Sequence, residues 1–267
     1  MPMRLCCAFL MLCIVLPAAA ARQPDLARER RMADEIVDTI LDGEPLQLSA
    51  TDGQLFLGIY TNSTQAPARG TVIILHGRGF HPDWVDVVQP LRIGLSTHGW
   101  NTLSIQMPVL DASAKYFDYV QIFDWAGPRI EAAIATARST APGPVVLLAH
   151  SCASHMAQHW MNVKGAQAVG QFDAFVGIGM GATDYRQQMV EPFALDKIGG
   201  PILDVYAQQD FPAVRRLAPQ RQAAMRRGGN PLNRQVVIPD AEHYFADRGE
   251  ALVDAVSTWL DRALRKP

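Results

Sequence analysis

The chain has 267 residues, of which 49% are hydrophobic, and its formal net charge at pH 7 is -2, with a pI near 6.4. This length fits one globular domain with a large core, or at most two small domains. The nearly balanced charge gives no basis for nucleic acid as a partner.

The first 21 residues have the three-part pattern of a secretory signal peptide. A positively charged start precedes an almost wholly apolar run from Leu5 to Leu16, and small residues follow that run. The apolar run is too short to span a membrane, so no stable membrane span is expected once the signal is removed. We predict cleavage after Ala20 or Ala21, with an uncleaved anchor as the alternative.

Only one of the four cysteines, Cys152, follows the predicted signal peptide. The mature chain therefore cannot form an internal disulfide, and its stability must come from its core. Exported domains without disulfides are common in the bacterial periplasm. We expect the protein to be periplasmic or secreted, and favour the periplasm.

The first expected elements are a helix and a hairpin. Apolar residues recur at helical spacing over 25–42, which predicts an amphipathic helix. Gly43 is expected to end it. Two extended segments, 45–50 and 54–61, follow, and the Thr-Asp-Gly between them is typical of a hairpin turn.

From residue 70 the chain alternates apolar runs with helical stretches. The expected strands are continuous apolar runs, which suit strands that are covered on both faces. They span 71–75, 102–107, 145–149, 174–180, 202–207 and 235–238. The expected helices span 84–98, 126–140, 152–162, 212–227 and 248–264. This alternation predicts an α/β fold with a mostly parallel central sheet and helices on both faces.

No repeat, low-complexity tract or long linker divides this part of the chain. We therefore expect three parts, which are a signal peptide (1–21), an N-terminal amphipathic helix (22–44) and a single α/β domain (45–267). Only a loop's length of chain lies at 181–200, so no large cap domain is expected and the site should be open. Five apolar residues near that loop are expected either to line a pocket or to belong to the core. They are Met180, Tyr185, Met189, Phe193 and Phe211.

Polar residues lie in the short segments that follow four of the expected strands. They are the loop His-Gly-Arg-Gly at 76–79, then Ser151, Asp210 and His243. Ligands in open α/β sheets bind beyond the carboxyl ends of the strands. Each residue also has a simpler interpretation, since Ser151 and Asp210 could cap helices and His243 could be a surface residue. Their order at separate strand ends favours a catalytic set.

The motifs resemble the α/β-hydrolase superfamily from about residue 45 to the C-terminus. Within it, the segments 75–108, 201–214 and 234–245 are similar to a family of exported bacterial α/β-hydrolase-like proteins of uncharacterised function. The resemblance implies the α/β-hydrolase fold and a serine hydrolase.

The turn around the serine departs from the superfamily pattern. The usual Gly-x-Ser-x-Gly motif has small residues that let the helix pack close to the strand. Here the motif has alanines at both glycine positions, Ala149 and Ala153. Alanine adds only a methyl group at each place, which weakens the match without removing it.

Chemistry assigns a role to each residue of the set. A serine hydroxyl needs an adjacent base, so Ser151 is the predicted nucleophile and His243 the predicted base. A carboxylate must orient the imidazole, and Asp210 is the predicted acid, with Asp184 in reserve. Three other carboxylates are less favoured, namely Asp204, Asp240 and Glu242.

The negatively charged oxygen of the intermediate needs hydrogen-bond donors. The resemblance assigns them to the backbone N–H groups of Cys152 and Arg78, with Gly79 as the substitute. A catalytic Cys152 thiol is the less favoured alternative. His155 and His159 lie four residues apart, but no third metal ligand follows them at a spacing typical of a metal site. No metal or cofactor is therefore expected.

Five arginines make the helix at 212–227 basic, namely Arg215, Arg216, Arg221, Arg226 and Arg227. A solvated helix face is the favoured interpretation, and contact with an anionic envelope component is the alternative.

The sequence thus predicts an exported serine hydrolase that cleaves an ester or related acyl bond through an acyl-enzyme. Its partner would be a small-molecule or envelope-derived acyl substrate. One alternative is a non-catalytic envelope protein that kept the scaffold and binds a partner. A weaker alternative is an amidase or peptidase.

Overall fold

The computed structural model describes residues 22–265, and the predicted signal peptide at 1–21 lies outside this range. The strands are β1 (Glu44–Ser49), β2 (Leu55–Thr61), β3 (Thr71–Leu75), β4 (Asn101–Ile105), β5 (Val145–His150), β6 (Ala174–Ile178), β7 (Ile202–Ala207) and β8 (Arg234–Ile238). The α-helices are α1 (Leu26–Val37), α2 (Val88–Thr97), α3 (Tyr116–Val120), α4 (Ala126–Thr140), α5 (Cys152–Lys164), α6 (Ala166–Val169), α7 (Pro212–Gly228) and α8 (Gly249–Ala263).

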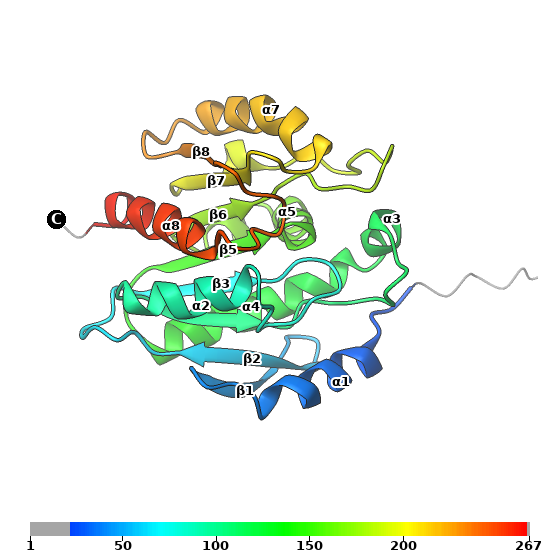
Figure 1. Cartoon of the computed structure of the whole chain (residues 1–267), viewed down its shortest axis with the longest axis vertical. Helices are drawn as coiled ribbons and strands as arrows, with labels where there is room; N and C mark the ends of the chain where they lie inside the picture. Colours follow the sequence, from blue (N-terminus) through cyan, green and yellow to red (C-terminus); the bar gives the residue numbers. More distant parts are fainter. Residues whose placement is uncertain (1–21, 266–267) are drawn as a thin grey trace, which may run out of the picture.

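All eight strands form one sheet in the order β1-β2-β4-β3-β5-β6-β7-β8. β2 pairs antiparallel with β1 and β4, and every other neighbouring pair is parallel. Helices cover both faces of the sheet (Figure 1). The predicted mostly parallel sheet with an N-terminal hairpin is therefore confirmed.

The central strands are buried on both faces. In β3, Val72 and Ile74 point into the core beneath α2 and α8, whereas Ile73 and Leu75 point into the core beneath α4 and α5. All four side chains are completely inaccessible to solvent. This two-sided burial is why the strand sequences are continuously apolar and do not alternate.

The N-terminal helix is shorter than the sequence pattern predicts. The expected helix at 25–42 ends at Val37 in the structure. Leu41, the last apolar residue of the pattern, is 94% exposed and does not pack against the domain. Because helices are stabilised mainly by packing of their apolar face, the final turn does not form.

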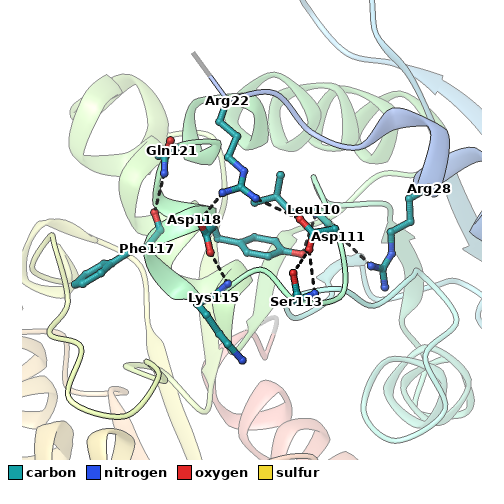
Figure 2. Close-up of polar contacts among 10 residues, drawn as sticks. Arg22, Arg28, Leu110, Asp111, Ser113, Lys115, Phe117, Asp118 and Gln121 are labelled. Atoms are coloured by element: carbon teal, nitrogen blue, oxygen red, sulfur yellow. Dashed lines mark hydrogen bonds and ion pairs between the residues drawn. The ribbon is translucent and has the colours of Figure 1, made fainter. Parts of the chain in front are cut away.

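The first described residues attach to the segment that follows β4 (Figure 2). Arg22 pairs with Asp111 and Asp118, and Arg28 donates a hydrogen bond to the Leu110 carbonyl at 3.1 Å. The Arg28 guanidinium also lies 3.5 Å from the carbonyl oxygen of Gly79. The start of α1 therefore sits beside the glycine-rich loop after β3.

The connection between β6 and β7 holds only a short 3-10 helix, Leu195–Lys197, so no cap domain is inserted there.

The short helices α3 and α6 were not predicted, because each is too short to show a periodic pattern. Within residues 22–265, no helix combines the length and the apolar character needed to cross a membrane.

Candidate active site

Ser151 stands on the sharp turn between β5 and α5. Its backbone has φ 53° and ψ -119°, a conformation that side-chain-bearing residues rarely adopt. The residue occupies the N-cap position, yet its side chain makes no capping hydrogen bond. Its Oγ lies instead 2.8 Å from His243 Nε2. The simpler interpretation of this serine as a helix cap is therefore wrong.

His243 bridges Ser151 and Asp210. Its Nδ1 lies 2.6 Å from Asp210 Oδ1, and that carboxylate also accepts the N–H groups of Ala207 and Phe211. An ionised carboxylate only accepts hydrogen bonds, so Nδ1 carries the proton and Nε2 can accept from the serine hydroxyl. The structure brings the three predicted residues into one buried hydrogen-bonded chain.

Neighbouring groups hold the His243 imidazole in place. The Phe211 ring stacks on it with a centroid distance of 4.1 Å. Buried His150 donates from Nε2 to the His243 carbonyl at 3.3 Å, and burial lowers the pKa of His150 to about 3, so it stays neutral. Gly179 has φ 61°, and a Cβ there would lie 2.8 Å from His243 Cε1. The imidazole is thus confined on several sides.

Asp184, the reserve candidate for the acid, lies elsewhere in the site. It receives two hydrogen bonds from Arg78, at 2.7 and 3.1 Å, and one from the Tyr116 N–H at 2.6 Å. Burial raises the pKa of Asp184, but these bonds outweigh it and hold the pKa below its ordinary value. Asp184 therefore binds the glycine-rich loop to the loop after β6.

The remaining carboxylates do not contact the imidazole. Asp204 is fully buried on β7, where it pairs with Arg221 at 2.8 Å and accepts from Gln235 at 2.7 Å. Asp240 and Glu242 are exposed. Among residues 22–265, Asp210 is thus the carboxylate that hydrogen-bonds to the imidazole of His243.

The glycine-rich loop passes directly against the serine turn. A Cβ added to Gly77 would lie 3.3 Å from the Ser151 Cβ, and Gly79 has φ 76°. Within the described part of the chain, the backbone N–H groups of Arg78, Gly79 and Cys152 have no hydrogen-bond acceptor. Free donors of this kind next to a serine hydroxyl can bind an oxyanion.

His76 anchors the base of this loop. Its Nε2 accepts the Met107 N–H at 2.9 Å, and its Nδ1 lies 2.8 Å from the Gly77 carbonyl. Burial lowers the pKa of His76 to about 3, so the ring is neutral. The bonds connect the ends of β3 and β4 and fix where the loop starts.

The Cys152 thiol is buried at the start of α5. Burial raises its pKa to about 12, so the thiol stays protonated at neutral pH. A protonated thiol is a poor nucleophile, which is consistent with a role for the backbone of this residue alone.

A cleft of about 590 Å³ opens above Ser151. Its aromatic lining consists of Phe80, Tyr116, Tyr185, Phe211 and Tyr244. Of the five apolar residues expected near the pocket, Tyr185 and Phe211 line the cleft and Met180 is part of the core. Sequence reasoning missed Phe80, Tyr116 and Tyr244, although Phe80 and Tyr244 stand next to motif residues.

The histidine pair on α5 has other partners. His155 is buried beside Tyr116, and burial lowers its pKa to about 4. His159 lies between Asp124 and Glu191, at 2.7 and 2.6 Å. Over the described range, no group of three or more His, Cys, Asp or Glu side chains is placed to hold a metal ion.

Comparison with known proteins places the fold. Residues 11–117 match a family described as "Protein of unknown function (DUF3530)". A comparison with curated protein sequences finds no match. Many solved structures are similar to the chain.

Est1E from Butyrivibrio proteoclasticus is 15% identical with a TM-score of 0.61, covering 84% of this chain and all of that one. XC6422 from Xanthomonas campestris, a serine hydrolase without lid, is 14% identical with a TM-score of 0.61. The match covers 85% of this chain and 98% of XC6422. Dienelactone hydrolase from Anabaena variabilis is 18% identical with a TM-score of 0.60. The match covers 84% of this chain and 100% of that hydrolase. The chain therefore has the α/β-hydrolase fold, and its N-terminal part resembles a family of unknown function.

Proposed function

We propose that this protein is an exported serine hydrolase that cleaves an ester or related acyl bond through an acyl-enzyme. The observation that carries the proposal is the continuous chain of hydrogen bonds from Ser151 through His243 to Asp210, with distances of 2.8 and 2.6 Å. This arrangement is that of an activated nucleophile with an oriented base.

The first half of the reaction forms the acyl-enzyme. Ser151 Oγ attacks the substrate carbonyl carbon while His243 Nε2 takes the hydroxyl proton, and the carbonyl oxygen becomes an oxyanion. The free N–H groups of Cys152 and of Arg78 or Gly79 would bind that oxyanion. Collapse of the intermediate breaks the ester bond, and His243 returns the proton to the departing alcohol.

Hydrolysis of the acyl-enzyme completes the cycle. A water molecule enters the open cleft and gives a proton to His243 Nε2 as its oxygen attacks the acyl carbon. The proton then returns to Ser151 Oγ, and the carboxylic acid leaves. Asp210 stays ionised throughout and stabilises the positive charge that the imidazole carries transiently.

Export to the periplasm forms part of the proposal. The pattern of residues 1–21 supports it, as does a mature chain with a single, buried cysteine, whose fold needs no disulfide. Mass spectrometry of the protein recovered from a periplasmic extract should find an N-terminus at residue 21 or 22. A full-length chain in the cytoplasmic fraction would contradict export.

Ester turnover tests the activity. Short 4-nitrophenyl esters should be hydrolysed by the parent protein, and Ser151→Ala and His243→Ala should each reduce kcat by about 10³-fold or more. Lys197→Gln serves as the control, because Lys197 is exposed and takes part in none of the ion pairs within residues 22–265. Absence of turnover by a folded parent protein across esters, amides and lactones would favour the non-catalytic alternative.

A further inference from the structure

The cleft above Ser151 carries an excess of positive charge. Its lining includes three arginines, Arg78, Arg186 and Arg216, and a single acidic residue, Asp184. Arg78 and Asp184 neutralise each other through their two hydrogen bonds. None of the ion pairs formed within residues 22–265 involves Arg186 or Arg216. Two guanidinium groups therefore remain for a ligand.

The two groups reach the cleft from separate elements. Arg216 lies near the start of α7, and the first residues of that helix, Pro212 and Ala213, line the same cleft. The N-terminus of a helix adds a partial positive charge to that of the side chain. Arg186 belongs to the loop after β6, where its guanidinium lies over the Tyr185 ring at 5.0 Å.

Other arginines of α7 have different surroundings, which separates Arg216 from a general basic face. Arg221 is buried against Asp204, and Arg227 pairs with Asp196. Arg215 is exposed and does not line the cleft. Arg216 thus combines a position on the cleft with a charge that no described acidic side chain neutralises.

We infer that the substrate is an ester bearing a carboxylate, which Arg186 and Arg216 bind in the cleft that contains Ser151. A guanidinium presents paired N–H donors that match the two oxygens of a carboxylate. The aromatic side chains of the cleft would contact the uncharged part of the substrate. This inference rests on the proposed function and adds the substrate class to it.

Two pairs of esters that differ only in charge test the inference. One pair is mono-4-nitrophenyl adipate and its methyl ester, which places the charge on the acyl side. The other is 4-acetoxybenzoate and its methyl ester, which places it on the alcohol side. In at least one pair, kcat/KM at low salt should be about tenfold higher for the acid, since charged hydrogen bonds contribute more than neutral ones.

Arginine variants identify the groups responsible. Arg186→Gln with Arg216→Gln should lower kcat/KM for the acid relative to that for its methyl ester, so that the ratio of the two falls to about one. Arg215→Gln, one residue away on the same helix, should keep the preference. Added salt should weaken the preference in the parent protein, because both side chains are exposed.

The outcomes separate the inference from the proposed function. Equal or slower turnover of the acid in both pairs, or a preference that survives the double substitution, would overturn the carboxylate site. Failure of the parent protein to cleave any of the four esters would count against the hydrolase itself. In that case, calorimetric binding of adipate to the parent protein, lost in the double variant, would still support the carboxylate site, and absence of binding would overturn it.

Discussion

His243 Nε2 lies 2.8 Å from Ser151 Oγ although 92 residues separate the two along the chain. The parallel sheet produces this contact, because β5 and β8 both end at the edge where Ser151 and His243 follow them. The same edge receives Asp210 after β7, at 2.6 Å from His243 Nδ1.

The identity of the acid gives the first prediction. Asp210→Asn should reduce kcat by about 10³–10⁴-fold, because an amide cannot hold the imidazole in the required tautomer. Asp184→Asn should reduce kcat by roughly tenfold or less, since Asp184 contacts Arg78 and the Tyr116 N–H and does not contact the imidazole. Steady-state kinetics on one ester compares them, and a greater loss in Asp184→Asn would show that the acid is misassigned.

A glycine behind the imidazole gives the second prediction. Gly179→Ala places a methyl group 2.8 Å from His243 Cε1 at a backbone φ of 61°. The imidazole must shift, and we expect kcat to fall about 10²-fold with little change in KM. Gly229→Ala is the matched control, because Gly229 also has a positive φ, 75°, but no atom lies within 4 Å of a Cβ there. Equal kcat values for both variants would contradict the predicted crowding.

The backbone of the nucleophile gives the third prediction. Ser151→Gly and Ser151→Ala both remove the hydroxyl, but only glycine is free of strain at φ 53° and ψ -119°. The glycine variant should therefore have a free energy of unfolding about 1 kcal/mol above that of the alanine variant. Urea denaturation measures the difference. A less stable glycine variant would mean that the turn is not strained.

Stability towards acid gives the fourth prediction. Burial lowers the pKa of His76 and His150 to about 3 and that of His155 to about 4. In the unfolded chain these histidines take up protons below about pH 6.5, whereas in the folded protein they stay neutral until pH 3–4. The free energy of unfolding should therefore fall as pH drops below about 6.5, by up to about 2 kcal/mol per histidine at pH 5.

His155 offers a way to isolate this effect. Its ring packs among Tyr116, Phe123 and Phe193, so phenylalanine fits the same surroundings. His155→Phe should lose less stability than the parent protein between pH 7.5 and pH 5 in urea denaturation. An unchanged loss would mean that this histidine does not resist protonation in the folded state.

Much of the fold could be predicted because its strands are buried on both faces. β3 and β7 have the expected bounds, since continuous apolar runs end where the buried sheet ends. The α1 pattern predicts a longer helix because periodicity cannot show that Leu41 lacks a packing partner. Five-residue α3 was missed because it is too short for a periodic signal.

Some features of the candidate site could likewise be predicted from the sequence, and others could not. Ser151, Asp210 and His243 could be placed because each lies in the turn or loop that follows a strand of a parallel sheet. The pairing of Arg78 with Asp184 could not, because it depends on the path of the loop after β6. The position of Arg216 on the cleft likewise depends on where α7 begins relative to that loop, which no residue pattern specifies.

Labelling with a fluorophosphonate probe tests the central claim most directly, because the probe reacts with a serine only when a neighbouring base activates it. The mature protein should gain one adduct, which peptide mapping should locate at Ser151. Labelling should disappear in Ser151→Ala and fall sharply in His243→Ala. A folded parent protein that takes up no probe, or takes it up at another residue, would contradict the assignment of Ser151 as the nucleophile.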